Sequence, residues 1–566
     1  MAISDGALFM VLANVILTLA APRASPIVDL KYARYQGIAN ATLGTTSYYS
    51  IPFAEPPTQN LRWQPPAPIE NSSVYKGNPL QDATIPGVAC IQTTPQWGVQ
   101  LLADLQDGKI GSPLARAAFG TSSLNQTQSE DCLRLDIVVP NRPKSQKLPV
   151  VVMIHGGAYV SGSSLTADGN AFVSESNGAV ISVSIQYRLG PYGFLASKEI
   201  KQDGTANAGL LDQRLALDWV QRHISTFGGD PTKVTIWGGS AGGGSVGLQM
   251  MLYGGVANPP FRGGISEYPG FVPFHNSETQ AAAYHDLLTL TGCSSLKCLR
   301  ALPAANLANA SQEIYALGYA AGRYGYGDPY FGPVVDGNII RDLPSTAFKV
   351  GHFSKIPIIC DREAYEGFAF TNFSINKDDQ VLPDVKAFWP NVDPASSYFS
   401  NLMNLYPKTD FQLFLDPILA LYAALVPQTL LNVPFYQRAG IFGDAVINCP
   451  SYYMAEGVSN YGTPAWKMRF AAGNEAHGSA ASFTLQPSAT SGNLFLARQL
   501  KDYYVSFITT LDPNAFTTFL KPVWPQYKPF SYQILNVEQL TVDSRRDPDA
   551  SSRCAFFRSQ NEYSLI

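Results

Sequence analysis

The stretch that most constrains the fold is residues 234–249, VTIWGGSAGGGSVGLQ. Its first four residues are apolar or β-branched, as in a short buried strand, and small residues suited to a sharp turn and then a helix follow. Ser240 falls at this turn, where its hydroxyl would be lifted into the open. The N–H groups at the start of the helix, beginning with Ala241, would face an oxyanion formed there. The stretch therefore predicts a nucleophilic serine on a strand–turn–helix element.

A second match to the same Gly-x-Ser-x-Gly pattern follows directly, at residues 243–247. Only position separates the two serines. Ser240 ends the predicted strand, whereas Ser245 lies more than one turn inside the predicted helix, where a hydroxyl usually bonds to the backbone. We therefore predict that Ser240 is the functional serine and that Ser245 is structural.

Strand and helix patterns alternate around this element. Residues 148–154 (LPVVVMI) and 179–187 are nearly continuous apolar runs, which is typical of strands buried on both faces. Residues 209–227 have the spacing of an amphipathic helix that ends at a Gly-Gly pair. This alternation predicts an α/β fold with a large, mostly parallel central sheet and helices on both faces.

The first residues of the chain indicate the cellular compartment to which the protein is directed. Residues 7–21 form an apolar run too short to span a membrane comfortably, and Pro22 and Arg23 follow it. This is typical of a secretory signal peptide, which we place at residues 1–21. Asp5 and the lack of a basic residue before the run leave an uncleaved signal anchor as the alternative. No later apolar run is long enough to cross a bilayer, so we expect a secreted, extracellular protein.

The charge balance excludes some partners. A formal net charge of −4 at pH 7 and a pI near 5.9 provide no basic patch to attract nucleic acid or an anionic membrane. Asn-x-Ser/Thr sequences are acceptors for N-glycosylation in secreted proteins. The chain has five of them: Asn40, Asn71, Asn125, Asn309 and Asn372.

Seven cysteines would face an oxidising compartment. Cys293 and Cys298 are close enough in sequence to close a small loop, and Cys90 and Cys132 bracket a long one. Spacing alone does not fix the pairing. The remaining cysteines leave one thiol over: Cys360, Cys449 and Cys554.

The loop at residues 90–132 contains apolar residues at helical spacing, beginning with Trp97, Leu101 and Leu105. Gly108, Gly111 and Pro113 interrupt this pattern further along. The loop could be a flap or lid over a pocket, or a surface excursion whose apolar face packs on the core. Helical spacing alone favours plain packing.

A second glycine-rich turn, residues 155–159 (HGGAY), ends the first apolar strand. Small residues let backbone N–H groups approach a substrate oxygen closely, which is what an oxyanion hole requires. The same residues also suit a tight turn with no further role. The pattern by itself does not distinguish the two.

A serine nucleophile needs a base and an acid that orients it. Of the six histidines, His477 lies in a late loop before a glycine, after a strand-like run, whereas His155 and His223 lie at positions that suit structural roles. A base late in the chain, with the acid between serine and histidine, is the order of an α/β-hydrolase. Glu363 and Glu366 follow the apolar run 356–359, and spacing does not choose between them.

These residues are part of a wider resemblance to the type B carboxylesterases, α/β-hydrolases that include cholinesterases, fungal lipases with a disulfide-framed lid, and non-catalytic adhesion proteins. It extends over nearly all of the mature chain, from about residue 37 to 557, and implies one domain at residues 22–566. The motifs that carry it lie at residues 51–63 (IPFAEPPTQNLRW), 129–133 (SEDCL), 207–213 (NAGLLDQ), 227–231 (FGGDP), 238–242 (GGSAG), 524–527 (WPQY) and 553–557 (RCAFF).

The resemblance implies a role for several residues. It implies that Ser240 is the nucleophile, His477 the base and Glu366 the acid. Glu363 is the other candidate for the acid. The implied oxyanion donors are the N–H groups of three residues: Gly157, Ala158 and Ala241. The implied disulfides are Cys90–Cys132, Cys293–Cys298 and Cys449–Cys554, which leaves Cys360 free. The implied structural ion pairs are Arg62–Glu130 and Arg188–Asp212.

Two departures from the family pattern limit what it implies about substrates. Gly239 stands where a glutamate usually precedes the serine, so choline esters are disfavoured as substrates. Tyr268 and Pro269 stand where Ser-Gly is common, so the pocket is expected to have a different shape. Neither change removes a residue of the expected triad.

The resemblance implies a serine carboxylic ester hydrolase that works through an acyl-enzyme and needs no metal or organic cofactor. The expected partner is a small-molecule or lipid ester. A long-chain lipase or sterol esterase of the same mechanism is the alternative, and a non-catalytic adhesion protein is the rival from another class. The sequence does not indicate an oligomeric state.

Overall fold

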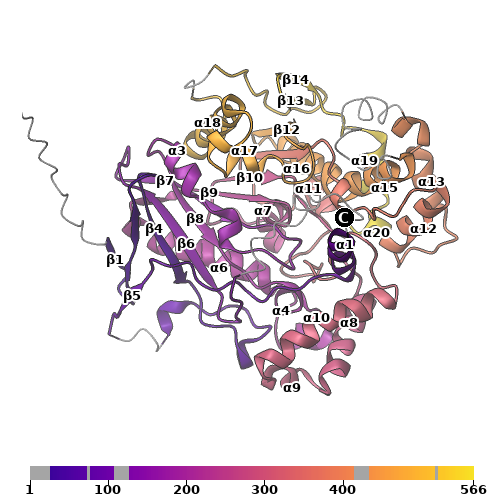
Figure 1. Cartoon of the computed structure of the whole chain (residues 1–566), viewed down its shortest axis with the longest axis horizontal. Coiled ribbons are helices and arrows are strands. Elements are labelled where there is room, and N and C mark those ends of the chain that lie inside the picture. Colours follow the sequence, from indigo (N-terminus) through magenta and orange to yellow (C-terminus); the bar gives the residue numbers. More distant parts are fainter. Residues whose placement is uncertain (1–25, 73–76, 108–125, 413–431, 517–519) are drawn as a thin grey trace, which may run out of the picture.

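The computed structural model describes residues 26–72, 77–107, 126–412, 432–516 and 520–566 (Figure 1). Its centre is an 11-stranded sheet in the order β14-β13-β12-β11-β10-β9-β7-β8-β6-β4-β3. The strands are β3 (Ile38–Asn40), β4 (Thr45–Pro52), β6 (Arg134–Pro140), β7 (Leu148–Ile154), β8 (Ile181–Ile185), β9 (Gly229–Gly239), β10 (Gly263–Glu267), β11 (Ile358–Glu363), β12 (Ala465–Ala471), β13 (Gln533–Glu538) and β14 (Val542–Arg546). A small separate sheet contains β1 (Ile27–Asp29), β2 (Arg34–Gln36) and β5 (Leu80–Asp82).

The middle of the large sheet is parallel. Every neighbouring pair from β8 through β7, β9, β10, β11 and β12 to β13 is parallel, and the pairs nearer the two edges are antiparallel. Strands β8, β10 and β11 are buried along their whole length, as expected for parallel strands covered on both faces. The predicted mostly parallel sheet is therefore confirmed.

Helices surround this sheet (Figure 1). They are α1 (Gln96–Gln106), α3 (Asn170–Glu175), α4 (Gly190–Phe194), α5 (Lys198–Gln202), α6 (Ala208–His223), α7 (Ala241–Met251), α8 (Ser277–Thr291), α9 (Leu296–Ala301), α10 (Ala304–Ala320), α11 (Pro344–Val350), α12 (Asp378–Phe388), α13 (Ser397–Leu405), α15 (Val433–Gly443), α16 (Cys449–Asn460), α17 (Ala481–Thr484), α18 (Leu494–Thr510), α19 (Ser552–Ser559) and α20 (Asn561–Ser564).

Two strand residues show that helices cover both faces. The ring of Trp237 on β9 lies 5.1 Å from that of Tyr504 on α18, centroid to centroid. Ser266 on β10 is in register with Gly238, the next residue along β9, and its hydroxyl donates a hydrogen bond to the carbonyl of Gly243 in α7. Because successive strand residues point to opposite faces, α18 and α7 lie on opposite sides of the sheet.

Some element ends differ from those predicted. The strand expected at residues 356–359 is β11, which starts two residues later and runs on to Glu363. Its parallel pairing with β12 extends it, and Glu363 is in register with Phe470. Glu363 is therefore the last residue of a buried strand, and Glu366 lies in the loop after it.

The structure pairs six cysteines as the resemblance implies, in the bonds Cys90–Cys132, Cys293–Cys298 and Cys449–Cys554. Cys360 is free and buried in β11. The two expected ion pairs are also present: Arg62–Glu130 and Arg188–Asp212, each with a nitrogen–oxygen distance of 2.7 Å.

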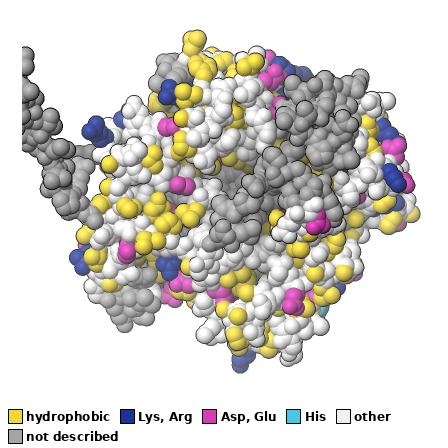
Figure 2. Space-filling model, viewed as in Figure 1, with side chains coloured by type: hydrophobic (Ala, Val, Ile, Leu, Met, Phe, Trp, Pro, Cys, Tyr) yellow, Lys and Arg dark blue, Asp and Glu magenta, His cyan; other side chains and the backbone are white. Residues whose placement is uncertain are grey.

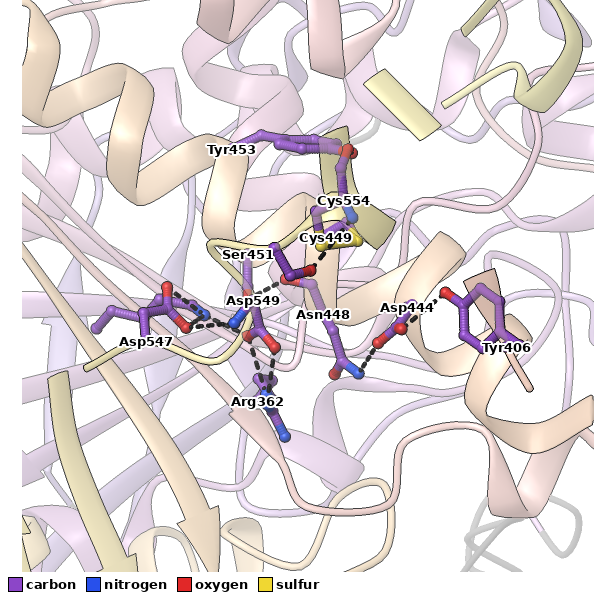
Figure 3. The surroundings of a disulfide bond; sticks show 12 residues. Arg362, Tyr406, Asp444, Asn448, Cys449, Ser451, Tyr453, Asp547, Asp549 and Cys554 are labelled. Carbon is purple, nitrogen blue, oxygen red and sulfur yellow. Dashed lines mark hydrogen bonds and ion pairs between the residues drawn. A yellow bond between two sulfur atoms is a disulfide. The ribbon is translucent and has the colours of Figure 1, made fainter. Parts of the chain in front are cut away.

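The third disulfide lies beside a buried ionic cluster (Figure 3). Arg362 on β11 donates to both carboxylate oxygens of Asp549, at 2.7 and 3.0 Å, and Lys467 on β12 contacts Asp549 and Asp547. Burial opposes ionisation of Asp549, but the charges of Arg362 and Lys467 hold its pKa below the usual range. The cluster fixes the C-terminal segment against β11, whose end leads into the Glu366 loop.

Several predictions about secretion fall partly outside the described residues, which exclude residues 1–21 and Asn125. The side chains of Asn40 and Asn309 are exposed and that of Asn372 is half-buried, while Asn71 ends a short 3-10 turn. Of the described helices, none combines the length and apolarity needed to cross a membrane. Charged side chains of both signs are scattered over the described surface visible in Figure 2.

Candidate active site

Ser240 occupies a strained turn between β9 and α7. Its φ of 59° and ψ of −127° are unusual for a residue other than glycine. The turn needs its flanking glycines, because a Cβ at Gly238 would lie 2.4 Å from the Gly242 backbone, and one at Gly242 would lie 2.1 Å from the Ile154 carbonyl oxygen. Close packing between β7, β9 and α7 therefore presents the serine as the sequence predicts.

The structure brings Ser240, His477 and Glu366 into one hydrogen-bonded chain. Nε2 of His477 lies 2.8 Å from Oγ of Ser240, and Nδ1 lies 2.5 Å from Oε2 of Glu366. Glu366 follows β11 and His477 follows β12, so the parallel strands carry both side chains to the same edge of the sheet as the serine. The side chains of Glu366 and His477 are buried, whereas Ser240 keeps some exposure.

The side chain of the other acid candidate, Glu363, is not hydrogen-bonded to His477 in the described part of the chain. Its Oε1 accepts a hydrogen bond from the Ala480 N–H at 2.8 Å, and its own N–H donates to Oε1 of Glu366 at 2.5 Å. Glu363 therefore supports the two loops that carry Glu366 and His477 without touching the imidazole.

The glycine turn after β7 lies directly beside the serine. A Cβ at Gly156 would be 3.0 Å from the Cβ of Ser240, so only glycine allows this approach. Gly157 has a φ of 107°, and its carbonyl accepts hydrogen bonds from the N–H groups of Val160 and Ser161 at 3.0 and 2.9 Å. The segment is thus a tight turn, and it also lines the space in front of Ser240.

Three N–H groups at this point are left for a ligand. Within the described part of the chain, the N–H groups of Gly157 and Ala158 have no backbone acceptor. Ala241 is the first residue of α7, so its N–H has no partner inside the helix. These are the predicted oxyanion donors: Gly157 and Ala158 line the same cavity as Ser240, and Ala241 follows the serine directly.

The remaining serine and histidine candidates have structural partners. Oγ of Ser245 is fully buried and accepts a hydrogen bond from Gln213 at 3.0 Å. The ring of His155 stacks on Tyr187 with centroids 4.4 Å apart, and burial lowers its pKa to about 4. Nε2 of His223 lies 2.7 Å from Glu70. In the described part of the chain, none of these three side chains is hydrogen-bonded to Ser240, His477 or Glu366.

A buried group of carboxylates behind the site was not predicted from the sequence. Glu267 at the end of β10 accepts hydrogen bonds from Trp237 at 2.7 Å and from the Tyr504 hydroxyl at 2.9 Å. The same hydroxyl lies 2.9 Å from Oδ2 of Asp361. Burial raises the pKa of Glu267 to about 7, and it raises the pKa values of Asp361 and Glu363 well above their usual range. Parallel pairing of β10 with β11 creates this cluster.

The buried carboxylates lead to a prediction about how the stability of the protein depends on pH. The pKa of Glu267 is raised from its ordinary value of 4.5 to about 7 on folding, so the folded chain binds more protons than the unfolded chain between these values. Its contribution is complete below pH 4.5 and is lost as pH rises through 7, by at most about 3 kcal/mol. Thermal unfolding measured at pH 5 and at pH 8 should therefore show that the stability lost between these two pH values is smaller in Glu267→Gln than in the wild type. Equal losses would contradict the assignment.

An apolar cavity of about 270 Å³ opens in front of the candidate triad. Ser240, His477 and the glycine turn form one side of it. Its remaining wall is mainly apolar and includes Trp97, Leu102, Met153, Trp237, Phe370 and Leu485. A second space of only about 20 Å³ adjoins Ser240 and is lined by Val272, Phe442, Val446 and Ile447, among others. The site can therefore hold a largely apolar ligand against the serine.

Helix α1 is the helical part of the predicted flap in the described residues, which exclude 108–125. Trp97 and Leu101 are each 1% exposed, and the indole N–H of Trp97 donates to the Asp328 carbonyl at 2.6 Å. Gly98 and Leu102 line the cavity. Helix α1 thus packs on the core and forms a wall of the site.

The fold and the site together define a class. A mostly parallel sheet with a serine at the turn after a central strand, and a histidine and an acid from later loops, is the arrangement of the α/β-hydrolases. In the described part of the chain, no group of three or more His, Cys, Asp or Glu side chains is placed to hold a metal ion.

Comparison with known proteins gives the family. The chain belongs to the carboxylesterase family, whose model matches residues 24–557. It is 32% identical to Lipase 2 of Geotrichum candidum over 88% of this chain and 90% of the lipase, and 32% identical to Secreted lipase 1 of Botryotinia fuckeliana over 92% and 88%. The crystal structure of Aspergillus niger EstA superposes with a TM-score of 0.77 at 27% identity, over 96% of this chain and 99% of EstA. The chain is therefore a carboxylic ester hydrolase.

Proposed function

We propose that the protein is a secreted serine carboxylesterase in which Ser240, His477 and Glu366 form the catalytic triad. The observation that carries this proposal is the hydrogen-bonded chain from Glu366 through His477 to Ser240, open to an apolar cavity. The role of Glu366 is to hold the imidazole in the tautomer that accepts a proton at Nε2 and to stabilise the imidazolium.

The reaction then has two halves. Nε2 of His477 accepts the hydroxyl proton as Oγ of Ser240 attacks the ester carbonyl carbon, and the N–H groups of Gly157, Ala158 and Ala241 hold the resulting oxyanion. The bond to the alcohol oxygen breaks, and His477 gives its proton to the departing alcohol. Water then attacks the acyl-enzyme by the same route, releasing the acid and restoring the serine. Hydrolysis of p-nitrophenyl butyrate by the secreted protein tests this function directly.

Secretion and glycosylation belong to the same proposal. Relatives named as secreted lipases in Botryotinia fuckeliana and Gibberella zeae, the apolar N-terminal run and the three disulfides support it. The mass of the secreted protein should correspond to a chain cleaved near residue 21, and it should fall when N-glycans are removed. An unchanged mass after that treatment would remove glycosylation from the proposal.

A long-chain lipase of the same mechanism is the alternative, and it bears on the role of residues 90–132. Because Trp97 and Leu101 are buried and the Trp97 indole is hydrogen-bonded, we expect α1 to remain a fixed wall. Activity on tributyrin should then rise smoothly as the ester passes its solubility limit. A sharp rise when droplets form would indicate a lid and favour the lipase.

A further inference from the structure

Tyr268, the residue after β10, is held in a strained conformation at the edge of the cavity. Its φ is 33°, in a region that bulky residues rarely adopt. Its N–H donates to Oδ1 of Asp361 at 2.8 Å, and Glu267 and Asp361 place it in the buried carboxylate cluster. Strain of this kind persists where the surroundings impose it, and it is concentrated at functional sites.

The ring of Tyr268 fills space left by Gly239, the residue before Ser240. A Cβ at Gly239 would lie 2.3 Å from the Tyr268 hydroxyl oxygen, so any side chain at position 239 would displace the ring. The ring also meets the His477 imidazole edge to face, with centroids 5.0 Å apart. The hydroxyl therefore lies beside the residue that precedes the serine, and the ring packs against the base.

The Tyr268 hydroxyl is a donor without a partner. The residue is only 6% exposed, lines the main cavity, and its hydroxyl makes no hydrogen bond within the described part of the chain. Burial and the neighbouring carboxylates, Glu267 first among them, raise the pKa of Tyr268 well above 10. The hydroxyl thus stays protonated and offers a hydrogen bond to whatever occupies the apolar cavity.

We propose that Tyr268 is a specificity-determining residue that donates a hydrogen bond to an acceptor oxygen close to the scissile bond of the substrate. The preferred substrates are esters with an ether, keto or hydroxyl oxygen near the ester group, and plain hydrocarbon esters are disfavoured. A site built around a polar donor discriminates against the analogue that leaves the donor unpaired. The inference rests on the proposed function, because it concerns the same serine site.

Three nearly isosteric esters test the proposal. They are n-butyl butyrate, 2-methoxyethyl butyrate and n-butyl methoxyacetate, in which one CH₂ is replaced by oxygen on the alcohol side or on the acyl side. Released acid is titrated for the wild type and for Tyr268→Phe. One oxygenated ester should lose about 3- to 10-fold in kcat/KM in the variant, while n-butyl butyrate changes by less than about twofold. The ester that loses activity identifies which side of the substrate meets Tyr268.

Ratios between esters measured on one sample do not depend on the fraction of folded enzyme. Tyr398→Phe is the matched control, since its hydroxyl is also buried without a partner among the described residues but lies outside the cavity. If Tyr268→Phe does not fold, Gly239→Ala, which forces the ring aside, should give the same selective loss. An equal change in all three esters, or no change, would overturn the role of Tyr268. A wild type inert toward all three would overturn the proposed function as well.

Discussion

Replacing Ser240 with alanine should lower kcat/KM for p-nitrophenyl butyrate by about 10⁴-fold or more, to the level that binding and the oxyanion donors provide alone. The substitution removes only Oγ, the atom 2.8 Å from Nε2 of His477. Because Ser240 is partly exposed to the cavity and its hydroxyl caps no helix, the melting temperature should change little. Initial rates and thermal unfolding of the purified secreted protein provide the two measurements.

Ser245→Ala is the matched control for this experiment. Ser245 lies in the second Gly-x-Ser-x-Gly match, is fully buried, and binds the side chain of Gln213. Its loss leaves the buried amide nitrogen of Gln213 without this acceptor, which should cost about 1–3 kcal/mol of stability with activity nearly unchanged. Full activity in Ser240→Ala together with inactivity in Ser245→Ala would reverse the assignment.

The serine and the histidine could be predicted because local sequence determines them. A sharp strand-to-helix turn requires small residues on both sides of Ser240, and the clashes that a Cβ would make at Gly238 and Gly242 show that packing enforces this pattern. His477 could be selected because the chain has few histidines and only one follows a late strand-like run before a glycine. The parallel sheet was predictable for the same reason, since its buried strands are apolar without interruption.

The features that the sequence did not reveal depend on which strands become neighbours. Glu267 and Asp361 are 94 positions apart, and they meet only because β10 pairs with β11 in register Ser266 to Cys360. Tyr268 was visible as a departure from the family pattern, and a changed pocket was expected there. That its hydroxyl lies against Gly239 follows from tertiary packing, which no local pattern encodes.

The choice between two glutamates three residues apart is of the same kind. It depends on where β11 ends, and pairing with β12 extends that strand to Glu363. Glu363 is thereby fixed in the sheet, facing the Ala480 N–H, and Glu366 is left free to turn toward His477. Sequence spacing carries no information about this pairing, so spacing alone leaves both residues as candidates, and the resemblance to the family is what favours Glu366.

Glu366→Gln should therefore reduce kcat/KM by about 10⁴-fold, because the amide no longer holds the imidazole in the reactive tautomer or stabilises the imidazolium. Glu363→Gln is the matched variant. Burial, and then the charges of Glu366 and Asp361, raise the pKa of Glu363 well above its usual range, which favours the uncharged carboxyl that glutamine resembles. Its activity should stay within about threefold of the wild type. Rates on p-nitrophenyl butyrate at pH 8, with melting temperatures to verify folding, distinguish the two. A collapse of activity in Glu363→Gln with Glu366→Gln still active would identify Glu363 as the acid and overturn the proposed triad.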